Sequence, residues 1–139
     1  MATLGTFVSG QVLTAAELNA IGTWTDYTPN VAASSGTITT GTLDFAQYSQ
    51  INDFVIVRFA YNITTAGTAA GASLTLDPPS GLTSLSTNGT GLGMGRENAV
   101  TGASLVVLQA GANFRIDWYT GAGWIANSRG AAVTFIFKV

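Results

Sequence analysis

Cysteine and histidine are both absent from this chain of 139 residues. Without cysteine there are no disulfides, thiolate nucleophiles or cysteine-bound metals. Without histidine the most common general base and metal ligand is missing, and catalytic pairs of the Ser-His or Cys-His type cannot form. We therefore expect a protein that is not an enzyme, with no catalytic residues, no cofactor and no metal site.

Charge is also scarce. Charged residues make up 9% of the chain, against roughly 25% in an average soluble domain. Depletion of charge is typical of interface cores, which favours a surface buried against other copies of the chain. The alternative is a weakly charged extracellular or virion surface without an extensive interface. The formal net charge of −2 gives no basic field for nucleic acid, and no basic amphipathic helix suggests a membrane surface.

Seven carboxylates remain as candidates for chemistry, and a glycosidase could use two of them. Asp44 and Asp53 flank an expected turn, while Asp117 shares a strand face with Arg115. We interpret these acids as solvated strand ends and an ion pair rather than as catalysts. The glycines of residues 89–95 lack the Lys-Ser/Thr of a phosphate-binding loop, so they indicate a turn leading into a glycine-rich strand.

The first residues lack a signal peptide, and no apolar run approaches the roughly 18 residues of a membrane span. We therefore expect a soluble chain made in a cytoplasm. Residues 14–22 predict a helix of two turns, because Thr14 and Glu17 match the capping box and Gly22 is a helix stop. So short a helix is not stable alone. Its apolar side chains must rest on the chain's own β-domain, on a neighbouring subunit or on a foreign partner.

From Tyr27 onward the hydrophobic period becomes strand-like. Alternation is clearest over residues 53–63, 112–119 and 131–139. Weaker strands fit residues 27–33, 37–51, 72–77, 92–98 and 104–109, with turn clusters between them. About eight strands at this spacing predict an all-β protein, an antiparallel β-sandwich or jelly roll. We expect an N-terminal anchor arm with a short helix over residues 1–26 and the β-sandwich domain over residues 27–139.

Five aromatic residues could form a platform for sugars: Trp24, Tyr27, Trp118, Tyr119 and Trp124. Trp124 lies in an expected turn, which makes it the candidate for an exposed glycan contact. Contact within the core or an interface is nevertheless the favoured interpretation for these rings. Trp24 and Tyr27 follow the predicted helix and are expected to fasten it to the sandwich.

The segment Gly10-Gln11-Val12-Leu13-Thr14-Ala15-Ala16-Glu17-Leu18-Asn19, followed by Trp24-x-x-Tyr27-Thr28-Pro29, resembles a leader of phage virion proteins. It is similar to the G-x-V-L-T-A-A-D/E-L-N segment and W-x-x-Y-T-P strand start of tail-fibre, minor-tail and head-decoration proteins. The pattern Gly41-Thr42-Leu43, Tyr48-x-x-Ile51 and Val55-x-Val57 looks like that family's second hairpin.

The resemblance implies an N-terminal anchor and a trimeric β-sandwich located in the virion. The size of the chain favours a capsid decoration (cement) protein that binds the major capsid protein and stabilises the shell. The alternative is a tail-fibre or minor-tail module that recognises host glycans. The candidate docking residues are Phe7, Val8, Leu13, Leu18, Ile21, Trp24 and Tyr27.

Overall fold

The structure is a computed structural model and describes residues 22–87, 89–98 and 103–139. In these ranges the regular structure is β-strand apart from one 3₁₀ turn, η1 (Gly67–Ala69). The strands are β1 (Thr25–Asp26), β2 (Val31–Ala33), β3 (Thr40–Ile51), β4 (Phe54–Thr65), β5 (Leu74–Leu76), β6 (Gly91–Glu97), β7 (Ser104–Ala110), β8 (Asn113–Trp118) and β9 (Arg129–Lys138). Each of the eight strands expected from the sequence has a counterpart, although the one expected over residues 27–33 is shortened to β2, and β1 is an additional strand.

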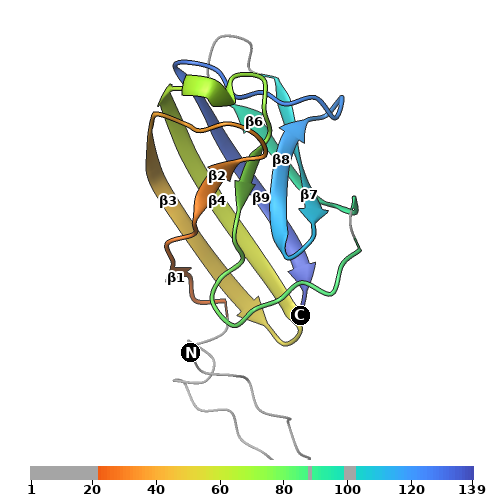
Figure 1. The fold of residues 1–139 in the computed structure, drawn as a ribbon. Coiled ribbons are helices and arrows are strands. Elements are labelled where there is room, and N and C mark those ends of the chain that lie inside the picture. The colour runs from red at the N-terminus through yellow and green to blue at the C-terminus, as the bar shows by residue number, and fades with distance from the viewer. Residues whose placement is uncertain (1–21, 88, 99–102) are drawn as a thin grey trace, which may run out of the picture.

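The nine strands form one antiparallel sheet in the order β1-β3-β4-β9-β6-β7-β8-β5-β2. The sheet curls into a half-barrel, with the long strands β3, β4 and β9 on one wall and β8, β5 and β2 facing them (Figure 1). This architecture confirms the all-β prediction and is compatible with a sandwich or jelly roll.

Residues 27–30 connect the two ends of the sheet. The N–H of Tyr27 donates to a carbonyl of β3 at 3.0 Å, which continues the pairing of β1. The N–H of Asp77 donates to the carbonyl of Asn30 at 3.3 Å, which continues the pairing of β2 with β5. Pro29, which has no N–H to donate, is buried where the chain leaves one edge for the other. The two edges are therefore bridged by four residues, and the sheet nearly closes on itself.

Alternation along β4 and β9 forms much of the core. Val55 and Val57 are fully buried, and they lie directly opposite Phe137 and Phe135 on β9. The ring of Phe114 on β8 packs against both phenylalanines, with centroid distances of 4.7 Å to Phe135 and 4.9 Å to Phe137. Aromatic contacts of this kind join the two walls of the half-barrel. Because side chains alternate along a strand, the intervening residues of β4 and β9 point outward.

The sheet begins before the domain division that the sequence suggested between residues 26 and 27, because β1 pairs with β3. The expected helix over residues 14–22 falls almost wholly in residues 1–21, which lie outside the described part of the chain. Within the described ranges, no helix has the length and apolar character needed to cross a bilayer.

Candidate interaction surface

The outer face of the sheet, formed by the outward side chains of β3, β4, β9 and β6, exposes large apolar residues. Phe54 is 52% exposed and Ile136 is 46% exposed. Ile51 lies directly opposite Phe54 in the register, and Ile56 lies directly opposite Ile136. These four residues, Ile51, Phe54, Ile56 and Ile136, form a continuous surface that we call the apolar patch. Side chains of this size on adjacent strands are a common feature of protein contact surfaces.

The apolar patch is bordered by an ion pair. Lys138 lies opposite Phe54, and its Nζ is 3.8 Å from a carboxylate oxygen of Asp53 in the β3–β4 turn. Leu85 is exposed and is held beside β9 by a hydrogen bond from its N–H to the carbonyl of Lys138, at 2.8 Å. An apolar centre with a charged edge is the usual anatomy of a protein–protein interface.

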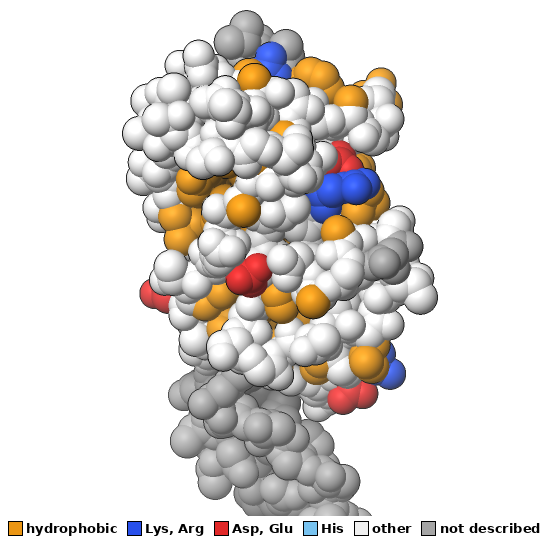
Figure 2. Space-filling view, viewed as in Figure 1, with side chains coloured by type: hydrophobic (Ala, Val, Ile, Leu, Met, Phe, Trp, Pro, Cys, Tyr) orange, Lys and Arg blue, Asp and Glu red, His pale blue; other side chains and the backbone are white. Residues whose placement is uncertain are grey.

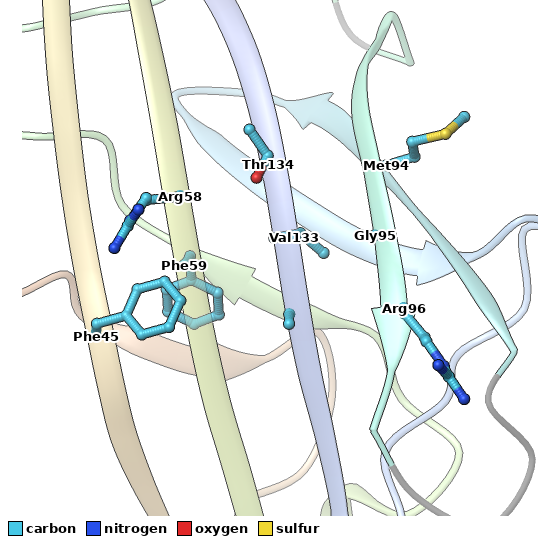
Figure 3. A pocket seen from close by; sticks show the side chains of 9 residues that line it. Phe45, Arg58, Phe59, Met94, Gly95, Arg96, Val133 and Thr134 are labelled. Carbon is cyan, nitrogen blue, oxygen red and sulfur yellow. The ribbon is translucent and has the colours of Figure 1, made fainter. Parts of the chain in front are cut away.

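A hollow of about 460 Å³ lies next to the apolar patch on the same face, and we call it the outer groove. It is lined by Phe45, Arg58, Phe59, Met94, Gly95, Arg96, Ala132, Val133 and Thr134. Figure 3 shows Phe45 and Arg58 on one side, with Met94 and Arg96 on the other. Between these long side chains lie the small residues Gly95 of β6 and Ala132 of β9, and the hollow lies above them.

Arg58 is held between two aromatic rings at the rim of the outer groove. Its guanidinium carbon lies 5.1 Å from the ring centroid of Trp24 and 5.2 Å from that of Phe45. Both rings are partly exposed. Stacking of a cation on aromatic faces at these distances is favourable by about 0.5–1 kcal/mol at an exposed site. The rings therefore restrict the position of a guanidinium that presents five N–H donors.

Positive charge is concentrated at the outer groove. The described residues contain three ion pairs: Arg115–Asp117 at 2.8 Å, Arg129–Glu97 at 3.3 Å and Lys138–Asp53 at 3.8 Å. The two remaining cations of the chain, Arg58 and Arg96, both line the groove, and none of the lining residues is acidic. On the side of the molecule seen in Figure 2, charged side chains are few, and most of the positive ones lie beside a negative one. The groove therefore carries a net positive charge on an otherwise weakly charged protein.

A second charged cluster is enclosed and serves the fold. The side chain of Glu97 is fully buried, and one of its oxygens lies 3.3 Å from Nε of Arg129. The indole N–H of Trp118 donates to the other oxygen at 3.3 Å. The guanidinium of Arg129 also lies 5.4 Å from the ring centroid of Trp118. A buried carboxylate needs such partners to offset its desolvation, so we assign this cluster a structural role.

The acidic residues of the described ranges are dispersed over the domain. The expected ion pair between Arg115 and Asp117 is present, although Asp117 is completely buried rather than solvated. Asp44 and Asp53 are both exposed, and Asp53 lies in the β3–β4 turn as expected. Asp44 lies within β3 at a register shift in the pairing with β4, so its expected place beside the turn is wrong. In the described ranges, no three acidic residues come close enough to hold a metal ion.

Tyr27 belongs to the packed edge of the domain. Its ring meets that of Tyr48 edge-on, with centroids 5.8 Å apart. Its hydroxyl is buried without a hydrogen-bond partner among the described residues. Burial raises the pKa of Tyr27 well above its usual range, and the nearby carboxylate of Asp77 raises this pKa further. Tyr27 is therefore fixed in the fold, whereas Trp24 lies on the outer face beside Arg58.

The other predicted docking residues cannot be placed. They are Phe7, Val8, Leu13, Leu18 and Ile21, and they lie outside the described residues. The structure separates the remaining two, since Trp24 is on the outer face and Tyr27 packs against the core.

Trp124 is buried, so the expected exposure of its ring is wrong. Only 1% of the residue is exposed, and its indole N–H donates to the carbonyl of Ile116 at 2.9 Å. The segment after β8 folds back over the domain, and the N–H groups of Trp124 and Ile125 both approach the carbonyl of Ala72 at 3.0 Å. The segment that the sequence suggested to be an exposed turn therefore contributes to the core. The core interpretation of Trp124 is confirmed, and its ring is not available for contact with a glycan.

The sequence reasoning missed the apolar patch. The signal was present in the even positions of the strand over residues 53–63, where Phe54 and Ile56 are as apolar as their buried neighbours. Ile136 likewise interrupts the alternation of β9 with an apolar residue on the outward side. Large apolar residues on the otherwise polar face of a strand indicate a surface that binds another molecule.

Comparisons with protein-family models, with curated proteins and with solved structures find no match to this chain. No family assignment follows from them.

Proposed function

We propose that this chain is a structural protein of a phage virion, a capsid decoration protein that binds the major capsid shell as a homotrimer. The observation that carries the proposal is the apolar patch, an exposed group of large side chains on a chain with very little charge. The resemblance of the N-terminal segment to phage virion proteins supplies the setting. The enclosed position of Glu97 and Asp117 is consistent with a protein that acts through contact rather than through a reaction.

The physical basis of such a function is contact area. A protein that binds only the assembled shell lowers the free energy of that shell by mass action. Three copies acting together gain avidity, so no single contact has to be strong. The apolar patch supplies the hydrophobic part of each contact, at roughly 25 cal/mol for each Å² removed from water.

The alternative is a tail-fibre or minor-tail module that recognises host glycans. Its candidate contact, Trp124, is in the core. Reconstruction of labelled particles distinguishes the two, because a decoration protein covers the head evenly and a fibre module lies at the tail.

The test uses Phe54→Asp and Ile136→Asp, each of which places a charge at the centre of the apolar patch. We expect the natural chain to be a trimer by light scattering and to sediment with capsids. Each variant should lose at least one of these two associations, since burying an unpaired carboxylate is unfavourable by several kcal/mol. Ala32→Asp is the matched control, because Ala32 is exposed on β2, on the opposite wall.

Two results would contradict the proposal. One is a natural chain that remains a monomer at micromolar concentration and does not bind capsids. The other is a pair of patch variants that associate as well as the Ala32→Asp control.

A further inference from the structure

A second hollow, of about 560 Å³, lies across Met94 from the outer groove, and Met94 lines both. We call it the apolar hollow. It is lined by Met94 of β6, by Val106 and Leu108 of β7 and by Tyr119, which follows β8. Two glycines of β6 also line it, and a glycine has no side chain to fill the space. None of the residues that line the apolar hollow is charged, so it suits an apolar occupant.

The side chains around the apolar hollow are open to solvent. Met94 and Tyr119, at 72% and 71%, are the two most exposed large apolar residues of the described ranges. Figure 3 shows Met94 extending from β6 on the side away from Phe45 and Arg58. Val106 lies directly opposite Met94, and it points outward because its neighbours along β7 are fully buried. These residues hold a concave apolar surface in contact with water, which is typical of a binding surface.

The apolar patch is the counterpart of the apolar hollow in shape, and it lies on another part of the curved sheet. Its central side chains, Phe54 and Ile136, are large and about half exposed, so they stand out from β4 and β9. The hollow is centred on β6 and β7, and the sheet curls between β4 and β7 (Figure 1). The two surfaces therefore face in different directions. One copy can offer its patch to one neighbour and its hollow to another.

Charge is distributed differently around the two surfaces. The exposed acids of the described ranges all lie on the wall that carries the apolar patch, and they are Asp26 on β1, Asp44 on β3 and Asp53 in the β3–β4 turn. Arg58 and Lys138 are exposed on the same wall, so acids are in slight excess there. On β6, β7 and β8 the exposed charged side chains are two arginines, Arg96 and Arg115, because the two acids of these strands are fully buried. Contact between the patch of one copy and the hollow of another brings acids toward arginines, whereas contact between two hollows would bring arginines together.

We propose that copies of this chain join head to tail, with the apolar patch of one copy seated in the apolar hollow of the next. A two-fold dimer pairs one surface with itself, whereas a cyclic trimer repeats a contact between two different surfaces that match. The patch and the hollow are such a pair, because both are apolar, one is raised and the other is hollow. Phe54 and Tyr119 bring aromatic rings to the centre of the contact, where interfaces are enriched in them. This inference rests on the homotrimer of the proposed function and names the surfaces that form it.

Crosslinking between two single-cysteine variants of the full chain tests the contact, because the natural sequence has no cysteine. Ile136→Cys places one thiol in the patch and Val106→Cys places one in the hollow, and both variants keep the largest side chains of the two surfaces. The two variants, one of them with an affinity tag, are produced together so that their copies mix, and a short bismaleimide then joins nearby thiols. The control is Ala32→Cys produced together with Val106→Cys, because Ala32 is exposed on β2, outside both surfaces.

We expect the Ile136→Cys and Val106→Cys pair to give crosslinked dimers of one tagged and one untagged copy. Their yield should be at least roughly tenfold above the control, because the contact holds the two thiols at a millimolar effective concentration. Either variant alone should give little crosslinked product. In the chain without cysteine, Tyr119→Asp should abolish the trimer seen by light scattering, since it places an unpaired carboxylate in the apolar hollow, whereas Ala32→Asp should not. Because Tyr119 is exposed, circular dichroism should show the same fold in this variant.

Four outcomes would overturn the proposal. Equal yields with Ile136→Cys and with Ala32→Cys would show that the hollow does not select the patch. Efficient crosslinking of Ile136→Cys to itself would show a two-fold contact between patches. A natural chain with the mass of two copies would show a reciprocal pair in place of a head-to-tail ring.

The fourth outcome is a Tyr119→Asp variant that remains a trimer. If that variant also fails to bind capsids, the hollow is occupied by the capsid protein, and the proposed function stands while this inference falls. Conversely, the selective crosslink in a chain that does not bind capsids would support the head-to-tail contact and contradict the virion function.

Discussion

The buried ion pair between Glu97 and Arg129 allows a quantitative test of the fold. Glu97→Gln keeps the shape of the side chain and removes its charge. The variant amide can still accept the hydrogen bond from Trp118, but the guanidinium of Arg129 loses its ionic partner in an enclosed site. Breaking a buried pair by removing one partner is unfavourable by about 3–5 kcal/mol.

We expect the lower end of that range. The side chain of Arg129 retains 20% exposure, so water can offset part of the loss. Its guanidinium also lies 3.4 Å from the carbonyl of Trp124 and above the ring of Trp118. A decrease of about 3 kcal/mol in the free energy of unfolding is therefore expected, which is a large share of the 5–15 kcal/mol typical of a domain.

The assay is urea denaturation followed by tryptophan fluorescence, with Asp53→Asn as the matched control. The pair of Asp53 with Lys138 has a similar chemistry, but both side chains are more than half exposed and the atoms are 3.8 Å apart. Exposed pairs contribute about 1 kcal/mol or less. If Glu97→Gln and Asp53→Asn lower the free energy of unfolding by the same amount, the reasoning about burial is refuted.

Three further predictions concern the core and its edge. Trp124→Phe should lower the free energy of unfolding by about 1.5–3 kcal/mol, because it deletes a buried hydrogen bond and leaves a cavity, and calorimetry checks this. Gly95→Ala should lower it by more than about 2 kcal/mol, since the new Cβ would overlap the carbonyl oxygen of Ala132, whereas Gly91→Ala, with open space around the Cβ, should have little effect in the same denaturation assay. The raised pKa of Tyr27 means that its contribution to stability is present below about pH 10, the pKa of an unfolded tyrosine, and is lost as the pH rises further. Between pH 8.5 and pH 11 the natural chain should therefore lose more stability than Tyr27→Phe, and an equal loss in both would contradict the assignment.

Alternation was sufficient to predict most of the sheet. The strand expected over residues 53–63 became β4 (Phe54–Thr65), and the strand expected over residues 131–139 became β9 (Arg129–Lys138). In both strands the side chains of one face are mostly buried, so local sequence and tertiary packing favour the same conformation. The glycine-rich stretch was also interpreted correctly as a turn followed by a strand, β6.

The polar interior and the interaction surface could not be predicted in the same way. The pair of Asp117 with Arg115 was expected, but the complete burial of Asp117 was not. Glu97 is also buried, and its partner Arg129 comes from a different strand, β9. Trp124 sits in a turn, and its burial depends on how the segment after β8 returns over the domain. The outer groove combines residues from four strands. A local sequence pattern does not show which large and small side chains become neighbours across those strands, so the groove could not be predicted. Such features depend on contacts that are distant in sequence.

The bridge formed by residues 27–30 has a consequence for how copies of this protein can meet. A long β-strand left open at the end of a sheet can recruit a strand from another molecule, which leads to fibrils and precipitation. Here the short strands β1 and β2 occupy the two ends, and part of the backbone of β3 and β5 is already hydrogen-bonded to them. Molecules packed at high density can therefore associate through side chains, which give a defined geometry and a defined number of neighbours, with less tendency to add strands without limit.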